Sequence, residues 1–181
     1  RDGVKFHTTP YFKPTRDFNA DDVLFTFNRL LDKDMPFRKA YPTEFPYFTD
    51  MGMDKNIAKV EKIDDKTIKF TLNSVDAAII QNMAMHFASI QSAEYADKLL
   101  KEGKPADINQ KPIGTGPFVF KSYQKDSNIR YTGNKDYWKP EDVKIDNLIF
   151  AITTDPSVRV QKLKKNECQV TLFPRPADLK A

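Results

Sequence analysis

The sequence has little of several residue types on which whole classes of protein depend. Among 181 residues it has one cysteine, Cys168, and two histidines, His7 and His86. A lone cysteine excludes a disulfide framework within the chain. Two distant histidines with no cysteine pair cannot supply the three or four converging ligands of a zinc site. A haem iron accepts a single axial histidine, so haem stays open as a ligand.

Long apolar runs and a strong charge of one sign are also missing. No stretch approaches the ~20 apolar residues of a membrane-spanning helix. The 29 Lys and Arg residues are interspersed with 25 Asp and Glu residues, which leaves a net charge of +4. The densest basic cluster is Lys162, Lys164 and Lys165, at the end of a predicted helix, where cations suit the helix dipole. We therefore expect no nucleic-acid partner.

The motifs of nucleophilic catalysis are absent as well. The sequence has no Gly-x-Ser-x-Gly elbow and no pair of carboxylates that stands out as a glycosidase site. Cys168 lies between a predicted helix and a predicted strand, with polar neighbours on both sides. A thiol hydrolase that uses Cys168 and a histidine is the alternative of another class. The sequence favours a protein that is not an enzyme and has no cofactor.

Helical and strand periodicities alternate along the chain, which predicts a mixed α/β fold. Val23, Phe27 and Leu30 recur with helical spacing after Asn19, a good N-cap. Apolar residues alternate around the turn at residues 64–66, which predicts a hairpin. The pattern predicts helices over residues 20–31, 77–87, 93–101 and 158–165, and strands over residues 4–7, 57–63, 68–72, 118–123, 129–131, 145–152 and 169–173. We expect an irregular loop over residues 32–56 and a polar linker over residues 105–111.

Two segments carry the candidate ligand-binding residues. The aromatic side chains of Tyr41, Phe45 and Tyr47 suit a polar organic ligand, with packing onto the chain itself as the alternative. The run Gly114-Thr115-Gly116 cannot be a phosphate loop, because no third glycine follows and a strand comes next in place of a helix. Glycine permits unusual φ angles, so this run is either a tight structural corner or a backbone contact to the ligand.

Several blocks of the sequence resemble the family 5 extracellular solute-binding proteins. The most specific are residues 12–23 (FKPTRDFNADDV) and residues 112–118 (PIGTGPF). Shorter matching blocks are residues 3–7, 47–48, 87–90, 92–97, 137–138 and 165–170. The resemblance runs along the whole chain. It is nearest to the dipeptide-binding members and to their haem-binding and antimicrobial-peptide-transport relatives.

The resemblance implies the first lobe of a two-lobed, type II periplasmic binding protein that closes on its ligand. Residues 1–111 would form the peripheral subdomain of that lobe, and residues 112–181 its sheet-forming, hinge-side part. The opening strands and the second lobe would lie outside this sequence. In dipeptide binders the second lobe supplies the aspartate and the arginine that hold the two ends of the peptide.

The resemblance also implies a function and partners. A complete member captures dipeptides or short peptides in the periplasm and delivers them to the membrane permease of an ATP-binding-cassette importer. Haem or glutathione binding is the alternative within the family. We expect a monomer made with a signal peptide, in which Cys168 pairs with a cysteine that precedes Arg1.

Overall fold

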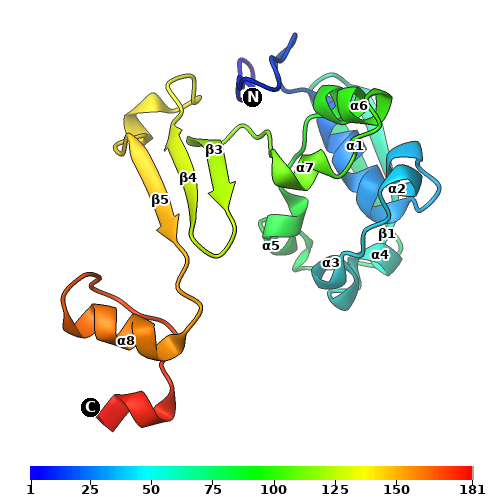
Figure 1. The fold of residues 1–181 in the computed structure, drawn as a ribbon. Coiled ribbons are helices and arrows are strands. Elements are labelled where there is room, and N and C mark those ends of the chain that lie inside the picture. Colours follow the sequence, from blue (N-terminus) through cyan, green and yellow to red (C-terminus); the bar gives the residue numbers. More distant parts are fainter. Residues whose placement is uncertain (181) are drawn as a thin grey trace.

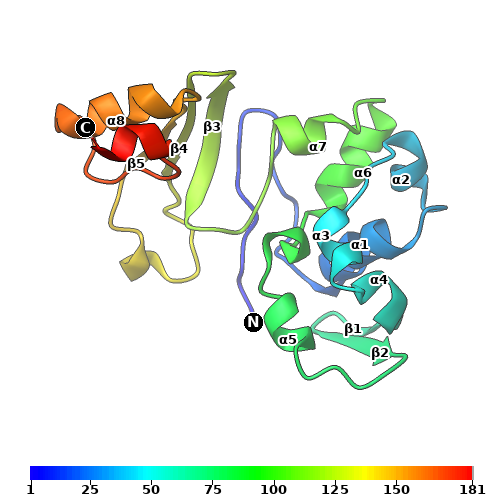
Figure 2. The same cartoon turned by 90° about the horizontal axis from the view of Figure 1, so that it is seen from below.

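Residues 112–118 join two differently built parts of the chain (Figure 1). The computed structural model describes residues 1–180. Most helices and a two-stranded sheet lie on one side, and a three-stranded sheet lies on the other. Seen from below, the N-terminal segment runs between the two sides (Figure 2). The mixed α/β fold predicted from the sequence is confirmed.

Helix α1 (Ala20–Leu31) lies between two buried apolar clusters. Its predicted N-cap, Asn19, accepts a hydrogen bond from the backbone of Asp21 at 3.0 Å. Phe25 packs into one cluster, whereas Phe27 and Leu30 pack into the other. The first cluster comprises Phe6, Phe12, Phe25, Phe37, Tyr95, Ala96, Leu99, Ile108 and Ile113, and the second comprises Phe27, Leu30, Phe48, Met53, Ile57, Val60 and Ala88.

A buried polar stripe runs along α1 between the two clusters. Asp22, Thr26 and Arg29 recur at positions i, i+4 and i+7 and are 0%, 3% and 3% exposed. The stripe binds the segment that precedes helix α6 (Ala93–Lys101). Ala93 N–H donates to Asp22 Oδ1 at 2.9 Å, and Gln91 N–H donates to Thr26 Oγ1 at 2.9 Å. Arg29 Nη1 donates to Gln91 Oε1 at 2.5 Å. We call these three α1 residues the polar stripe.

The predicted hairpin is confirmed as the antiparallel pair β1 (Ile57–Asp64) and β2 (Thr67–Leu72). Phe70 of β2 meets Phe27 of α1 edge to face, with 4.8 Å between the ring centroids. This contact seats the hairpin against the second cluster.

The loop predicted over residues 32–56 is wrong, because the segment folds into three short helices. They are α2 (Pro36–Ala40), α3 (Pro46–Asp50) and α4 (Met53–Asn56). Pro36 and Pro46 each occupy the first helical position, where the missing N–H costs no hydrogen bond. Phe37, Phe48 and Met53 are 2%, 0% and 0% exposed, so each short helix is held by a buried apolar side chain.

Between the hairpin and residue 111, the predictions are right in part. The α6 prediction is confirmed, with Ser92 as N-cap and Gly103 at φ 68° after the helix. The helix predicted over residues 77–87 is wrong: only α5 (Ile79–Asn82) and η1 (His86–Ala88) form, because the extended backbone of Met85 separates them, although Ile79 and Phe87 both pack against the second cluster. The predicted linker instead contains α7 (Asp107–Gln110), where Ile108 enters the first cluster.

The second part of the chain is an antiparallel sheet in the order β3-β4-β5. Its strands are β3 (Phe118–Gln124), β4 (Asn128–Gly133) and β5 (Asn147–Ala151), as the sequence predicts. The short helix η2 (Pro140–Asp142) interrupts the β4–β5 connection. Helix α8 (Pro156–Lys164) follows, as predicted, with Asp155 as its N-cap, and η3 (Pro176–Lys180) ends the described chain.

The strands predicted at residues 4–7 and 169–173 are wrong. The first segment makes isolated backbone hydrogen bonds, such as His7 N–H to Gly114 O at 2.8 Å, with no ladder. In the second, Val170 is 75% exposed, and Phe173 has a φ of 53° that breaks the extended alternation. A strand needs a neighbouring edge, and within residues 1–180 no strand pairs with either segment. No helix in that range is both long and apolar enough to cross a bilayer.

We expect Asp22 to contribute most of the stability that the polar stripe provides. Its carboxylate also accepts two hydrogen bonds from Arg16, at 2.7 and 3.0 Å. The substitution Asp22→Ala leaves buried donors without an acceptor, so the free energy of unfolding should fall by about 3–5 kcal/mol in urea denaturation. The control Asp21→Ala removes a partly exposed ion pair with Lys62 and should cost less than about 1 kcal/mol. Equal losses in the two variants would contradict this role.

Candidate functional site

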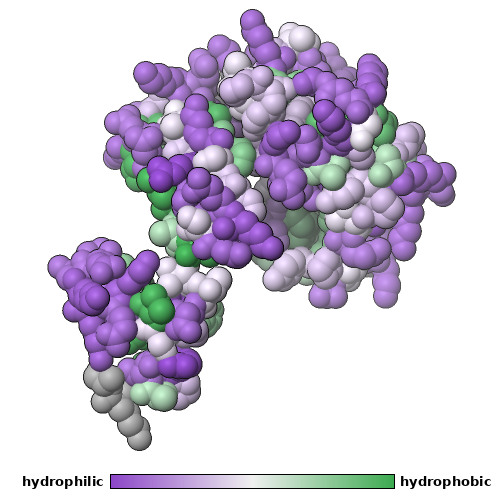
Figure 3. Space-filling model, in the orientation of Figure 1, coloured by the Kyte–Doolittle hydropathy of each residue, from purple (hydrophilic) through white to green (hydrophobic). Residues whose placement is uncertain are grey.

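A cavity of about 630 Å³ opens between the helical side of the chain and the three-stranded sheet. Figure 3 shows a hollow beside the sheet, with hydrophobic residues on its floor and polar residues around it. The volume lies within the ~300–1,000 Å³ that is typical of small-molecule sites. This cavity is the candidate ligand site.

Short helices present the aromatic wall of the cavity. Phe45 precedes α3, Tyr47 lies in its first turn, and Pro46 between them sets the start of the helix. Tyr47 is 56% exposed and meets the ring of His86 edge-on, with 4.9 Å between centroids. Phe87 follows His86 in η1 and also lines the cavity. This wall offers flat apolar surface together with a hydroxyl and an imidazole.

The opposite wall comes from residues 112–120 and from the sheet. Phe118 and Phe120 of β3 and Tyr131 of β4 line it. Phe120 and Tyr131 are paired across the two strands, edge to face, with 5.8 Å between their ring centroids. Because the sheet fixes these rings, this wall is a rigid apolar surface.

His7 fastens the two glycines of the cavity wall to the N-terminal segment. Its backbone N–H donates to Gly114 O at 2.8 Å, and its ring Nε2 lies 2.9 Å from Gly116 O. Asn134 donates a second hydrogen bond to Gly116 O, also at 2.9 Å. His7 is 7% exposed, and burial lowers the pKa of its imidazole. The neutral ring therefore donates from Nε2 and acts as a structural clasp.

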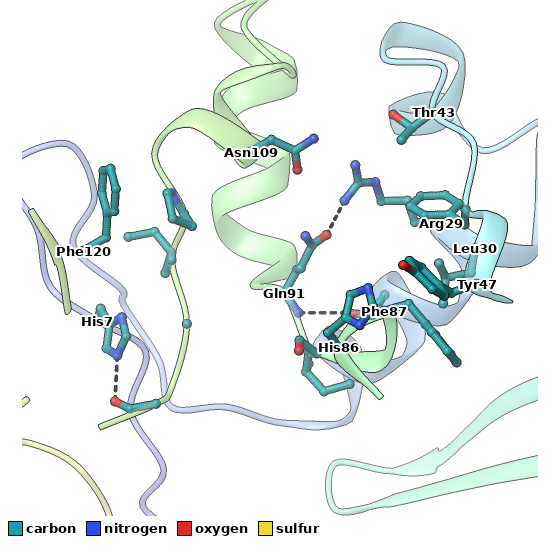
Figure 4. Close-up of a pocket in the computed structure, with 18 of the residues that line it drawn as sticks. His7, Arg29, Leu30, Thr43, Tyr47, His86, Phe87, Gln91, Asn109 and Phe120 are labelled. Atoms are coloured by element: carbon teal, nitrogen blue, oxygen red, sulfur yellow. Dashed lines mark hydrogen bonds between the residues drawn. The ribbon is translucent and has the colours of Figure 1, made fainter. Parts of the chain in front are cut away.

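Polar side chains gather at one end of the cavity. Figure 4 shows Arg29, Gln91 and Asn109 converging there, with Thr43 nearby. The Arg29 guanidinium donates to Gln91. Within the described chain, Glu44 supplies the one carboxylate of the lining, and it is exposed. This end of the cavity therefore suits a hydrogen-bonding or anionic group better than a cationic one.

The structure brings together four of the six residues predicted to bind ligand. Phe45, Tyr47, Gly114 and Gly116 line the cavity, whereas Tyr41 and Thr115 do not. The Tyr41 ring packs against the first apolar cluster, and its hydroxyl accepts a hydrogen bond from Asn109 at 3.3 Å. Ligand contact by any of the six stays a prediction.

The predicted reason for the two glycines is wrong. Neither Gly114 nor Gly116 has a positive φ. A Cβ built on Gly114 would lie 3.7 Å from the His7 ring, an ordinary contact distance, and one built on Gly116 would meet no atom within 4 Å. The corner therefore does not depend on a left-handed backbone. The two glycines leave the main chain along the cavity wall uncovered by side chains. The carbonyl group of Gly116 already accepts hydrogen bonds from His7 and Asn134.

The sequence reasoning did not place the polar residues of the lining in a site, among them His7, Arg29, His86 and Gln91. Arg29 continues the i, i+4, i+7 series of Asp22 and Thr26, but such a polar series normally indicates a solvated helix face. The histidines carried no signal, since their sequence separation hid that both would line one cavity. Cys168 does not line it, and within residues 1–180 no cluster of three or more metal-ligating side chains forms.

The comparison with known protein families is decisive. All of residues 1–181 match the family described as bacterial extracellular solute-binding proteins, family 5, middle region. The chain belongs to this family. The predicted resemblance is thereby confirmed, and members of the family are solute-binding proteins that act outside the cytoplasm.

Two relatives and one solved structure illustrate the range of this solute-binding family. Di/tripeptide-binding protein 1 of Pseudomonas aeruginosa (strain UCBPP-PA14) is 77% identical over 181 residues, which are all of this chain and 34% of that protein. Heme-binding protein A of Haemophilus influenzae is 48% identical over 179 residues, which are 99% of this chain and 32% of that protein. The dipeptide binding protein from Pseudoalteromonas sp. SM9913 in complex with Met-Leu matches with a TM-score of 0.89 at 42% identity, over 99% of this chain and 35% of that one.

The chain thus spans about a third of the length of the curated relatives that it matches. The match to a dipeptide-binding structure confirms the predicted periplasmic-binding-protein fold, of which this chain is one portion.

We expect His7 to make stability pH-dependent. Because burial lowers its pKa, the unfolded chain takes up a proton near pH 6.5, whereas the folded chain takes it up only at a lower pH. The free energy of unfolding therefore decreases as the pH falls below about 6.5, by at most about 1.4 kcal/mol per pH unit. The variant His7→Gln lacks this loss, so the gap in free energy of unfolding between wild type and variant should narrow from pH 7 to pH 5. Above pH 7.5 the gap should be constant. A constant gap down to pH 5 would refute the buried, neutral imidazole.

Proposed function

We propose that this chain is part of the solute-binding component of an ATP-binding-cassette importer, which captures dipeptides and short peptides in the periplasm. The observation that carries the proposal is the cavity, whose aromatic walls and polar end suit a short peptide. The names of the di/tripeptide-binding relative and of the Met-Leu complex support the same ligand class.

In this proposal, the cavity is one half of the binding site. Its one lining carboxylate is the exposed Glu44, so the described chain offers no buried partner for a peptide ammonium group. A second lobe outside residues 1–181 supplies the missing charges and closes over the ligand, with binding energy driving the shift to the closed state. Residues 1–111 act as the peripheral subdomain and residues 112–181 as the hinge-side part of the first lobe.

The same proposal includes the oligomeric state and the partners of the full-length protein. The full-length protein acts as a monomer, delivers its ligand to a membrane permease, binds no nucleic acid and catalyses no reaction. The cavity supports binding over catalysis, because it contains both histidines but not the only thiol, Cys168.

Cys168 is proposed to pair with a cysteine outside this chain. It has no partner within the chain because it is the one cysteine of the sequence. A non-reducing digest of the full-length protein tests the pairing. A free, alkylatable Cys168 would count against it and would revive the thiol hydrolase alternative.

Haem is the second candidate ligand. Two histidines line the cavity, and a relative with 48% identity is named heme-binding protein A. The aromatic walls would cover the flat faces of a porphyrin. Haem is the cargo in this alternative, not a resident cofactor.

Calorimetry on the full-length protein tests the ligand class. We expect binding of dipeptides, and negligible dipeptide binding by residues 1–181 alone, because the second lobe completes the binding site. Haemin and oxidised glutathione are the comparison ligands. Tight dipeptide binding by residues 1–181 alone would contradict the proposal that this cavity is half of the binding site. If the full-length protein bound none of these ligands, the proposed function would be wrong.

The aromatic wall can be tested by a single truncation. Tyr47→Ala removes an exposed ring from the cavity edge and should weaken peptide binding by about tenfold, with little change in the thermal midpoint. The matched control is Tyr123→Ala, which removes a tyrosine that is 49% exposed on β3 and does not line the cavity. Equal affinities for the two variants would place the ligand elsewhere.

A further inference from the structure

Arg29 carries a buried positive charge at the wall of the cavity. Its side chain lies between the rings of Phe37 and Phe45, each with its centroid 5.4 Å from the guanidinium carbon. Nη1 donates to Gln91, whereas Nε is buried and has no hydrogen-bond partner. No carboxylate among residues 1–180 forms an ion pair with it. Burial lowers the pKa of Arg29, yet a guanidinium stays protonated at neutral pH.

A comparison with the neighbouring buried arginine shows what is unusual about Arg29. Arg38 is 6% exposed and donates to the carbonyl groups of Arg29 and Leu30, at 2.6 and 3.4 Å, near the end of α1. Those carbonyls lie at the negative end of the helix dipole, which stabilises a cation. Arg29 has one amide oxygen as its acceptor, and it lines the cavity whereas Arg38 does not.

A buried cation with unused donors is unfavourable until an anion or a polar acceptor reaches it. Nη1 of Arg29 already donates to Gln91, and its remaining N–H groups can donate to a carboxylate, which binds a guanidinium more strongly than a neutral amide oxygen does. Gln91 is fixed by its backbone N–H bond to Thr26, so it holds the guanidinium at the polar end of the cavity (Figure 4). Asn109 at the same end adds a further amide.

We propose that Arg29, oriented by Gln91, recognises a carboxylate group of the bound ligand. This inference rests on the proposed peptide-binding function and adds to it a preference for acidic ligands. A dipeptide offers two sources of the carboxylate: an acidic side chain and its own carboxyl end. Both present the same chemistry to the guanidinium.

Three peptides separate the two sources in calorimetry on the full-length protein. Ala-Glu and Ala-Gln differ in the side-chain charge, and Ala-Gln and its C-terminal amide differ in the charge of the carboxyl end. We expect wild type to prefer the charged member of one pair by about tenfold or more. The variant Arg29→Gln should erase that preference, so that it binds the charged and the uncharged member of the pair with equal affinity.

A second test variant and a control variant accompany Arg29→Gln. Gln91→Glu places a carboxylate beside Nη1 inside the protein and should erase the same preference, which keeps the test available if Arg29→Gln does not fold. Arg38→Gln removes a buried arginine that does not line the cavity and should leave the preference intact.

Each outcome is decisive. Loss of the preference in Arg29→Gln and Gln91→Glu, but not in Arg38→Gln, supports the proposal. A wild-type protein that binds all three peptides equally, or a preference that survives both cavity variants, overturns it and leaves the peptide-binding function intact. Binding of none of the peptides by wild type overturns the peptide-binding function itself and the inference that rests on it.

Discussion

The helical side of this chain depends on a polar stripe inside an apolar frame. Asp22, Thr26 and Arg29 use one line of α1 to bind the segment at residues 91–93, while Phe25 and Phe27 pack on either side. Apolar packing alone would allow this segment to slide along the helix, since hydrophobic contacts have little directional preference. The hydrogen bonds of the polar stripe prevent this sliding, because it would leave the fully buried carboxylate of Asp22 without its donors. The stripe thus fixes the start of α6 and the position of η1.

That register extends to the cavity. The polar stripe binds residues 91–93, and the segment just before them, from His86 to Ile90, contributes to the helical wall of the cavity. Gln91 lies at the polar end of the cavity. On the other wall, His7 binds the corner at Gly114 and Gly116, and the β3–β4 pair holds Phe120 and Tyr131. Hydrogen bonds among the lining residues therefore hold both walls in position. The cavity surface itself carries few polar groups that a ligand would have to displace.

Regular elements with strong periodic patterns were predictable from the sequence. Helices α1, α6 and α8, the β1–β2 hairpin and the three strands of the second sheet have the caps, turns and alternation that physical rules require. The failures have two causes. Helices of four or five residues, such as α2, α3 and α7, are too short for a periodic signal, and each depends on a distant cluster for its stability. The segments at residues 4–7 and 169–173 have the alternation of strands, but pairing also needs a neighbouring edge, which alternation does not reveal.

The candidate site was predictable only in its aromatic and glycine components. Composition singled out Phe45, Tyr47 and the Gly114 corner. It could not distinguish Tyr41, whose ring packs into the first cluster, from Tyr47, whose ring lies at the cavity edge. That distinction arises from a turn of a few residues between α2 and α3. Arg29 was hidden because a charged residue on an amphipathic helix is normally solvated, and here both flanks of the helix are covered.

The proline-started short helices have a consequence for how such a protein diversifies. Phe45 and Tyr47 flank a proline that begins α3, and a single buried side chain, Phe48, anchors that helix. The hydrogen bonds of the polar stripe do not pass through this helix. Substitutions at the cavity-facing positions of α3 can therefore change the shape of the wall without breaking the hydrogen bonds that α1 makes. At this wall, the cavity-lining side chains of Phe45 and Tyr47 are thus distinct from the buried side chain that anchors α3, so the surface of the wall can change without loss of that anchor.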